Sequence, residues 1–510
     1  MRRSTLLAAA AAVWLVSGSV SAQAPASQGE VAFANSGAPA AQASFQRGVG
    51  LLHNFQYPQA VKAFQEAQRA DPGFAMAYWG EAMAENYTVW MEQHPDKARA
   101  ALAKLGPNRA ARLAKAKTPR ERGFLEAVEA LYGQGSKEQR DFAYSARMEQ
   151  LYRAYPRDVD AASFYALSLL GLAHKGRHFG LYMRSAAILE EHFPGHRRHP
   201  GVVHYLIHSY DDPVHAPLGL RAARLYGEIA PGSHHAQHMT SHIFIALPDW
   251  PATIQANRKA MEVVNRDRAA EGRKPGACGH YLEWMHYAHF QVDQADKAAP
   301  ILAACRTRAA AELAGVKDPG RGSPTRSYAT MRAQTIVETG AAPTPALAVD
   351  PSRFPAQEFD LAYGDLLLVR GKAAPLATAR ARLKAAAAKS PFAGMHPLAA
   401  KRQNIILVQA DGLDALAAGR RDEGLAALRK AAEIERTMEV PFGPPMVEKP
   451  SFELLGDELA ALGRQAEAAE AYAAALKLAP GRKRSLAGYA LASKGRPDGV
   501  STAAAGTHTH

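Results

Sequence analysis

SFELLGDELAALGRQAEAAEAYAAALKLAP, residues 451–480, is the stretch that decides the fold of this chain. Its apolar residues recur at the spacing of amphipathic helices, and small residues stand at fixed places among them. Small side chains let two helices cross closely, and Pro480 closes the second helix. The stretch therefore predicts a helix–turn–helix unit. The positions that carry the pattern are Phe452, Leu455, Gly456, Leu459, Gly463, Ala468, Tyr472, Ala475 and Pro480.

The same pattern returns elsewhere in the chain, which predicts a repeat array. An early unit has Gly48, Ala60, Phe64, Ala67 and Pro72, and a later one has Gly412, Gly419, Leu428 and Ala431. The 510 residues exceed one compact core, and an alanine-rich composition with few β-branched runs favours helices. We therefore predict an all-α, right-handed solenoid of tetratricopeptide repeats over residues 41–494. Insertions near 88–140, 174–200 and 266–279 interrupt its middle.

The two ends of the chain lie outside this array. Arg2 and Arg3 precede an apolar run, and a small-residue cleavage site ends at Ala22. Residues 1–22 therefore read as a signal peptide, with an apolar run too short for a transmembrane segment. Residues 23–40 and 495–510 are predicted to be a disordered lead-in and a disordered tail. We expect a periplasmic or secreted protein.

Charge and cysteine content narrow the partners. The net charge of +13 has two interpretations: arginines that coat solvated helix faces, or a basic surface that is attracted to the anionic surfaces of the cell envelope. No aromatic residues are interleaved with the basic ones, so a nucleic-acid partner is not expected. The two cysteines, Cys278 and Cys305, are most simply a disulfide in an exported protein. A role as metal ligands is the alternative.

Histidines are concentrated in the middle of the array: 12 of the 20 lie between residues 174 and 242. His204 and His208 are four residues apart, as are His238 and His242, and the two pairs are offset by 34 residues, the repeat period. A pair at this spacing lies on one helix face. Equivalent positions on adjacent repeats lie side by side, so the four imidazoles should converge on a metal.

The repeat register places further residues on the concave wall. His235 is second in its unit, while the two histidine pairs occupy the fifth and ninth positions. This makes His235 a fifth candidate metal ligand within the His-rich repeats at 199–295. Flanking candidates are His53, Asp211, Asp212, Glu283 and His280, and pocket candidates are Trp79, Tyr87 and Tyr287. The two aspartates could orient a ligand histidine.

The nature of the wall favours a divalent metal over other chemistry. A set of ligands that contains imidazoles but no thiolates suits Zn²⁺ or Cu²⁺, and Fe²⁺ is also compatible with it. An open coordination position would allow hydrolytic or oxidative chemistry on a small molecule in the groove. Two alternatives stay open: a scaffold that binds a peptide or protein segment through hydrogen-bonding or pH-sensing histidines, and a metal storage or delivery protein. There is no HExxH helix, phosphate-binding glycine loop or nucleophile elbow.

Two segments resemble the signatures of a family of exported bacterial tetratricopeptide-repeat proteins. They are HPGVVHYLIHSYDDP at 199–213 and HAQHMTSHIF at 235–244. LLHNF at 51–55, AMAYWG at 75–80, FGPP at 442–445 and the Lys449-Pro450 pair fit the same group. The resemblance covers nearly the whole mature chain. It implies the repeat fold and the importance of these positions, and it implies no particular reaction.

Overall fold

A computed structural model describes residues 28–316, 322–342, 344–389 and 397–494. The expected signal peptide (1–22) and tail (495–510) lie outside these residues. Within them the chain forms 23 α-helices, one short 3-10 helix and one two-stranded antiparallel sheet. The all-α class is therefore confirmed.

The first part of the chain, up to residue 192, contains nine helices and the small sheet. These elements are α1 (Pro39–His53), α2 (Tyr57–Ala70), α3 (Ala75–Met83), β1 (Asn86–Tyr87), η1 (Thr88–Trp90), β2 (Glu92–Gln93), α4 (Pro95–Leu105), α5 (Arg109–Leu113), α6 (Pro119–Leu131), α7 (Lys137–Ala154), α8 (Val159–Leu170) and α9 (Phe179–His192). The middle helices are α10 (Pro200–Ser209), α11 (Ala216–Ile229), α12 (His234–Ala246), α13 (Trp250–Ala270) and α14 (His280–Gln291). The remaining helices are α15 (Ala295–Leu313), α16 (Pro324–Thr339), α17 (Pro355–Leu368), α18 (Ala373–Lys389), α19 (Pro397–Ala417), α20 (Arg421–Arg436), α21 (Ser451–Ala461), α22 (Gln465–Leu478) and α23 (Lys483–Ala492).

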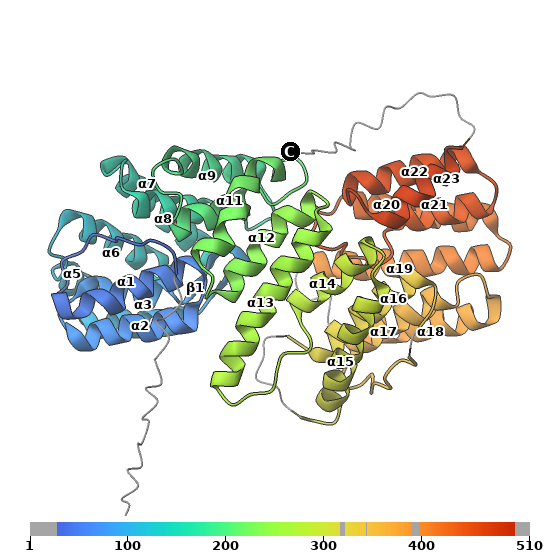
Figure 1. The fold of residues 1–510 in the computed structure, drawn as a ribbon, viewed down its shortest axis with the longest axis horizontal. Coiled ribbons are helices and arrows are strands. Elements are labelled where there is room, and N and C mark those ends of the chain that lie inside the picture. The colour runs from blue at the N-terminus through green and yellow to red at the C-terminus, as the bar shows by residue number, and fades with distance from the viewer. Residues whose placement is uncertain (1–27, 317–321, 343, 390–396, 495–510) are drawn as a thin grey trace, which may run out of the picture.

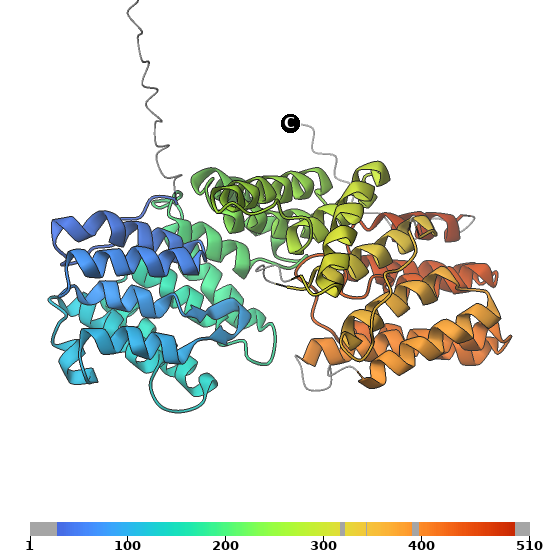
Figure 2. The same cartoon turned by 90° about the horizontal axis from the view of Figure 1, so that it is seen from below.

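Most helices pack against the next helix along the chain, and first helices of successive pairs also touch. Thus α8, α10 and α12 contact one another in order, and each packs on the helix that follows it. The middle helices α11 to α14 lie between the first and the last helices of the chain (Figure 1). This is a solenoid of helix–turn–helix repeats. The array also curls, because α1 packs on α10 across about 150 residues of sequence. Figure 2 shows the result: two lobes joined by the green middle helices.

Glycines at the predicted small positions lie against large side chains. A Cβ on Gly48 or on Gly80 would lie under 3.0 Å from the ring of Phe64, which fits between α1 and α3. A Cβ on Gly456 would meet the ring of Tyr472 at 2.9 Å in the same way. The small-residue pattern therefore marks real helix crossings.

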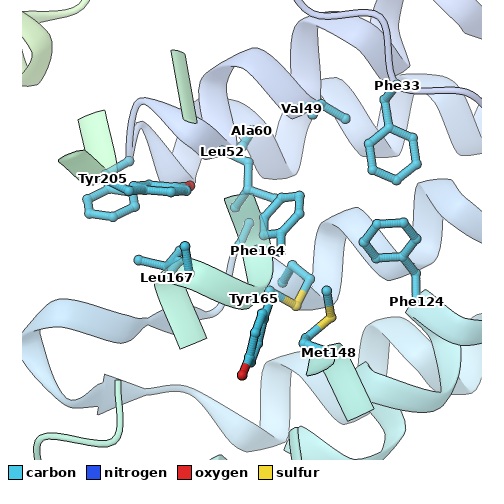
Figure 3. Packing of buried hydrophobic residues seen from close by; sticks show 14 of the residues in the cluster. Phe33, Val49, Leu52, Ala60, Phe124, Met148, Phe164, Tyr165, Leu167 and Tyr205 are labelled. Atoms are coloured by element: carbon cyan, nitrogen blue, oxygen red, sulfur yellow. The ribbon is translucent and has the colours of Figure 1, made fainter. Parts of the chain in front are cut away.

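Two separate hydrophobic cores follow from this arrangement, one in each lobe. In the first, Phe164 lies at the centre, and the ring of Phe33 points toward that of Phe124 at 5.0 Å (Figure 3). The second extends from α16 to α23. The middle helices α12 and α14 lie where the two cores meet, and a small cluster around Trp250 and Trp284 fills that junction.

Part of the expected disordered lead-in is packed on the first core. Residues 28–38 fall within the expected lead-in, yet Phe33 is buried and its backbone N–H donates to Gln46 at 2.9 Å. The hydroxyl of Ser36 donates to the carboxylate of Glu121 at 2.7 Å. The composition of this segment is that of a linker, but one aromatic side chain is enough to anchor it to the core.

A disulfide joins Cys278, just before α14, to Cys305 in α15, as expected. It removes both thiols from the set of possible metal ligands. No helix in the described part of the chain is long and apolar enough to cross a membrane.

Candidate metal centre

Three histidines from two stacked helices form a first cluster, here called group A: His204, His208 and His235. One ring nitrogen from each lies within 4.8 Å of the others. His204 and His208 are one turn apart on α10, with ring centroids 4.8 Å apart. His235 is the second residue of α12, and its Nε2 lies 3.2 Å from Nε2 of His204. Group A therefore combines one predicted pair with the additional histidine predicted at 235.

A second cluster, group B, contains His238, His242 and His280. His238 and His242 follow each other on α12, with their Nε2 atoms 3.2 Å apart. His280 begins α14, and its ring centroid is 4.6 Å from that of His238. His238 and His242 are buried, whereas His280 is exposed. Group B therefore has one side open to solvent.

The two groups are built by the same rule, and this corrects the expectation of one four-histidine centre. Each takes the fifth and ninth residues of one first helix and adds a histidine from the start of the next first helix. The ring nitrogens of the two pairs gather in two separate clusters, each completed by a histidine of the next first helix. The pairs lie side by side, with the rings of His208 and His242 6.4 Å apart.

Hydrogen bonds fix the protonation of the group B pair. His238 Nδ1 donates to Oδ1 of Asn257 at 2.7 Å, and that amide is oriented because its Nδ2 donates to the Thr253 carbonyl at 2.9 Å. His242 Nδ1 donates to Asp211 at 2.5 Å. A neutral imidazole carries one N–H, so both Nε2 atoms present lone pairs. When both rings are neutral, these two acceptors face each other with no proton to share.

In group A a backbone carbonyl determines which ring nitrogen of His204 carries the proton. His204 Nδ1 donates to the carbonyl of His53 at 2.6 Å, which leaves its Nε2 as the acceptor. The Nε2 of His208 is buried without a hydrogen-bond partner among the described residues. A neutral His235 can donate its Nε2–H to His204, so this group has one acceptor in need of a partner rather than two opposed lone pairs.

Burial keeps these rings in the neutral form that binds metals. It lowers the pKa of His208 to about 3, with a further contribution from the nearby His242. Burial, followed by repulsion from neighbouring imidazoles, also holds the pKa of His204, His235 and His238 well below the usual 6.5. Protons therefore compete weakly with a metal at these sites.

Two aromatic side chains that sequence reasoning missed enclose the groups. Phe55 lies 4.3 Å from the ring of His204 and adopts a positive φ of 54°, a strained conformation for a bulky residue. Trp284 lies 4.8 Å from His238 and 4.6 Å from His242. Trp284 stands four residues after His280, and this spacing was a usable signal. Asn257 was also missed, because nothing near it in sequence marks it.

His53 does not join either cluster. It lies in a third group with Asp160 and His199, where His199 Nε2 donates to Asp160 at 3.2 Å and His53 Nε2 is 3.6 Å away from the same oxygen. Arg120 also contacts this carboxylate, at 3.4 Å. A Cβ on Gly201 would lie 2.5 Å from the His53 ring, so this glycine lets α10 approach α1. The predicted flanking role of His53 is thus played by its backbone carbonyl.

Of the other flanking candidates, one contacts a histidine group and two do not. Asp211 orients His242, as the sequence suggested, but Asp212 accepts from His215 Nδ1 at 2.7 Å and reaches neither group. Glu283 lines a pocket of about 420 Å³ beside Trp284. Burial raises the pKa of the Glu283 carboxyl.

Of the three pocket candidates, only Tyr287 lines one of the main pockets. That pocket, of about 70 Å³, also contains His242 and Asp211. Trp79 is instead a core residue, with its ring against Phe124 at 5.3 Å. Tyr87 is buried by stacking on Tyr57 at 4.3 Å. Both predictions were wrong because a large aromatic ring at a repeat position packs inward when a neighbouring helix offers an apolar surface.

Comparison with known proteins gives structural neighbours only. No family model matches the chain, and no curated protein matches it. A crystal structure of the TPR domain of P58(IPK) is similar at 12% identity over 89% of this chain and 97% of that chain, with a TM-score of 0.21. The structure of Naa15/Naa10 bound to HypK-THB is similar at 13% identity over 89% of this chain and 66% of that chain, with a TM-score of 0.20.

Proposed function

We propose that this protein binds two divalent transition-metal ions, one at group A and one at group B. The observation that carries the proposal is the pair of opposed Nε2 atoms of His238 and His242, 3.2 Å apart. Each of these nitrogens carries a lone pair when its ring is neutral and its Nδ1–H is donated to Asn257 or Asp211. Two nitrogens on one tetrahedral zinc lie about 3.3 Å apart when both bonds are about 2.05 Å. A cation between them would replace a repulsive contact by two bonds.

The donor set supports zinc or copper. All six candidate ligands are imidazoles, and the cysteines are held in a disulfide. Nitrogen-only sites bind Cu²⁺ most tightly and Zn²⁺ also strongly, with Fe²⁺ weaker in the same series. Outer partners such as Asn257 and Asp211 are of the kind that raise ligand basicity.

The proposal extends to catalysis at group B. Three imidazoles leave a fourth position on a tetrahedral ion, and the exposure of His280 gives that position a route to solvent. A divalent metal there would supply a Lewis acid, or a redox centre in the case of copper. The resulting activity would be hydrolytic or oxidative, and storage or delivery of metal is the alternative use of the same sites.

We also propose an oxidising compartment for this chemistry, as the leader-like residues 1–22 suggest. The disulfide between Cys278 and Cys305 supports it, because such bonds persist outside the reducing cytosol. The two histidine-rich signatures supply five of the six ligands of the proposed sites and Asp211, which supports membership in the exported family that they resemble.

Elemental analysis of untagged protein tests the proposal. We expect two metal ions per chain. His204→Ala with His208→Ala should remove one ion, and His238→Ala with His242→Ala should remove the other. Because each double variant keeps one ion, the retained ion shows that the variant has folded. The exposed His196 lies outside the groups, so His196→Ala is the matched control and should keep both ions. Absence of metal from the native protein after incubation with Zn²⁺ and Cu²⁺ would overturn the proposal.

A further inference from the structure

We infer that group B alone takes an external ligand at its metal, and that this ligand is neutral rather than anionic. The inference rests on the proposed function, since it assumes an ion at each group. It adds the division of labour between the two sites and the chemical class of the molecule that reaches one of them.

Access separates the two groups. His242 lines the pocket of about 70 Å³, and Trp284, which packs on His238 and His242, lines the pocket of about 420 Å³. No group A residue lines any of the five main pockets in the described chain. A pocket of 70 Å³ holds several water-sized groups, because one water needs roughly 10–15 Å³ on the same measure.

Group A is closed by packing. His204 is fully buried, with Phe55 on one side at 4.3 Å and Tyr226 stacked on it at 4.9 Å. The hydroxyl of Tyr226 donates to Asn54 at 2.9 Å, which fixes the ring in place. An ion there would exchange slowly and meet no incoming molecule.

The charge of the smaller pocket selects the ligand. Four carboxyl groups line it, from Asp211, Asp212, Glu435 and Glu439, and no lysine or arginine does. Burial raises the pKa of the Glu435 carboxyl to about 7, so the other three carboxyl groups supply most of the negative charge. Asp211 and Asp212 each accept a histidine Nδ1–H, which leaves their negative charge in place when those rings are neutral. A divalent ion at group B attracts an anion, and these carboxylates oppose that attraction in a partly desolvated space.

Apolar and aromatic groups complete the lining. Trp250 and Tyr287 form one wall, and Met438 and Met446 belong to the segment between α20 and α21. Aromatic faces together with carboxylates favour amines and other nitrogen bases with an apolar body. The pocket thus fits a small neutral nitrogen base better than a phosphate or carboxylate.

Cobalt-loaded protein gives the test, because visible absorption of Co²⁺ reports a ligand added to its coordination. Imidazole and azide are the neutral and anionic probes, and metal content is measured on the same sample. With two ions bound, we expect imidazole to shift the spectrum saturably and azide to bind at least about tenfold more weakly. The shift should persist in His204→Ala with His208→Ala and vanish in His238→Ala with His242→Ala.

Removing carboxylate charge from the smaller pocket gives an independent test. Asp212→Asn with Glu439→Gln should tighten azide binding by about fivefold for each charge while leaving metal content at two, and His196→Ala should change nothing. Two bound ions without an imidazole shift, azide as tight as imidazole, or a shift that follows group A would overturn the inference and leave the proposed function standing. A sample without metal would overturn the proposed function itself.

Discussion

Asn257 accepts the Nδ1–H of His238 from the neighbouring helix at 2.7 Å, so a residue of α13 decides which nitrogen of a group B histidine faces the proposed metal. Asn257→Leu removes the acceptor, and we expect the metal affinity of group B to fall 10- to 100-fold. Asn257→Asp keeps an acceptor and should restore most of it. Competition with a chelator measures both affinities, with group A as the internal reference. Equal loss in the two variants would instead indicate a packing defect.

The pH dependence of the metal-free protein follows from the lowered histidine pKa values. Below about pH 6.5 the histidines of the unfolded chain become protonated, whereas the same rings stay neutral in the folded protein. The free energy of unfolding therefore falls as the pH falls. Each such histidine contributes about 1.4 kcal/mol per pH unit until its folded-state pKa is reached. Urea unfolding at pH 7.5, 6 and 5 measures this slope.

One variant isolates a single ring. His208→Gln should reduce the slope between pH 6 and 5 by about 1.4 kcal/mol per pH unit, because the folded-state pKa of His208 is about 3. The exposed His196 gives the control, and His196→Gln should leave the slope unchanged. An unchanged slope in His208→Gln would show that this ring titrates normally in the folded protein.

Gly443 holds the segment between α20 and α21 against Trp284. It has a φ of 128°, and a Cβ there would lie 2.2 Å from the indole. Gly443→Ala should displace Trp284 from the group B rings, shift tryptophan emission and raise the rate of metal loss from group B several-fold. Gly419→Ala adds the same kind of backbone strain at φ 78° without any contact within 4 Å, and is the matched control. If both variants showed the same emission and the same rate of metal loss, Gly443 would have no specific role in holding Trp284.

The disulfide should contribute stability without touching the sites. Closing a loop over the 27-residue separation of Cys278 and Cys305 is worth about 3–4 kcal/mol by chain entropy. Cys278→Ser with Cys305→Ser should lower the free energy of unfolding by about this amount and keep two bound ions. Loss of an ion would revive the alternative that these thiols are ligands.

The sequence predicts much of the site because helix periodicity and repeat period are both local. The spacing of His204 and His208, and its return after 34 residues, places four imidazoles on the inner faces of α10 and α12. The division into two groups depends on how the side chains of stacked helices are oriented toward one another, which no local spacing records. The insertion before His280 offsets α14 from the repeat period, so the sequence placed His280 among the flanking candidates rather than among the metal ligands.

Anomalous diffraction at the metal edge, from crystals of protein loaded with Zn²⁺ or Cu²⁺, tests the central claim most directly. We predict two peaks, one about 2.0–2.1 Å from a nitrogen of each group A histidine and one equally close to His238, His242 and His280. A single peak shared by both pairs, or peaks away from these histidines, would contradict the two-site structure proposed for this protein.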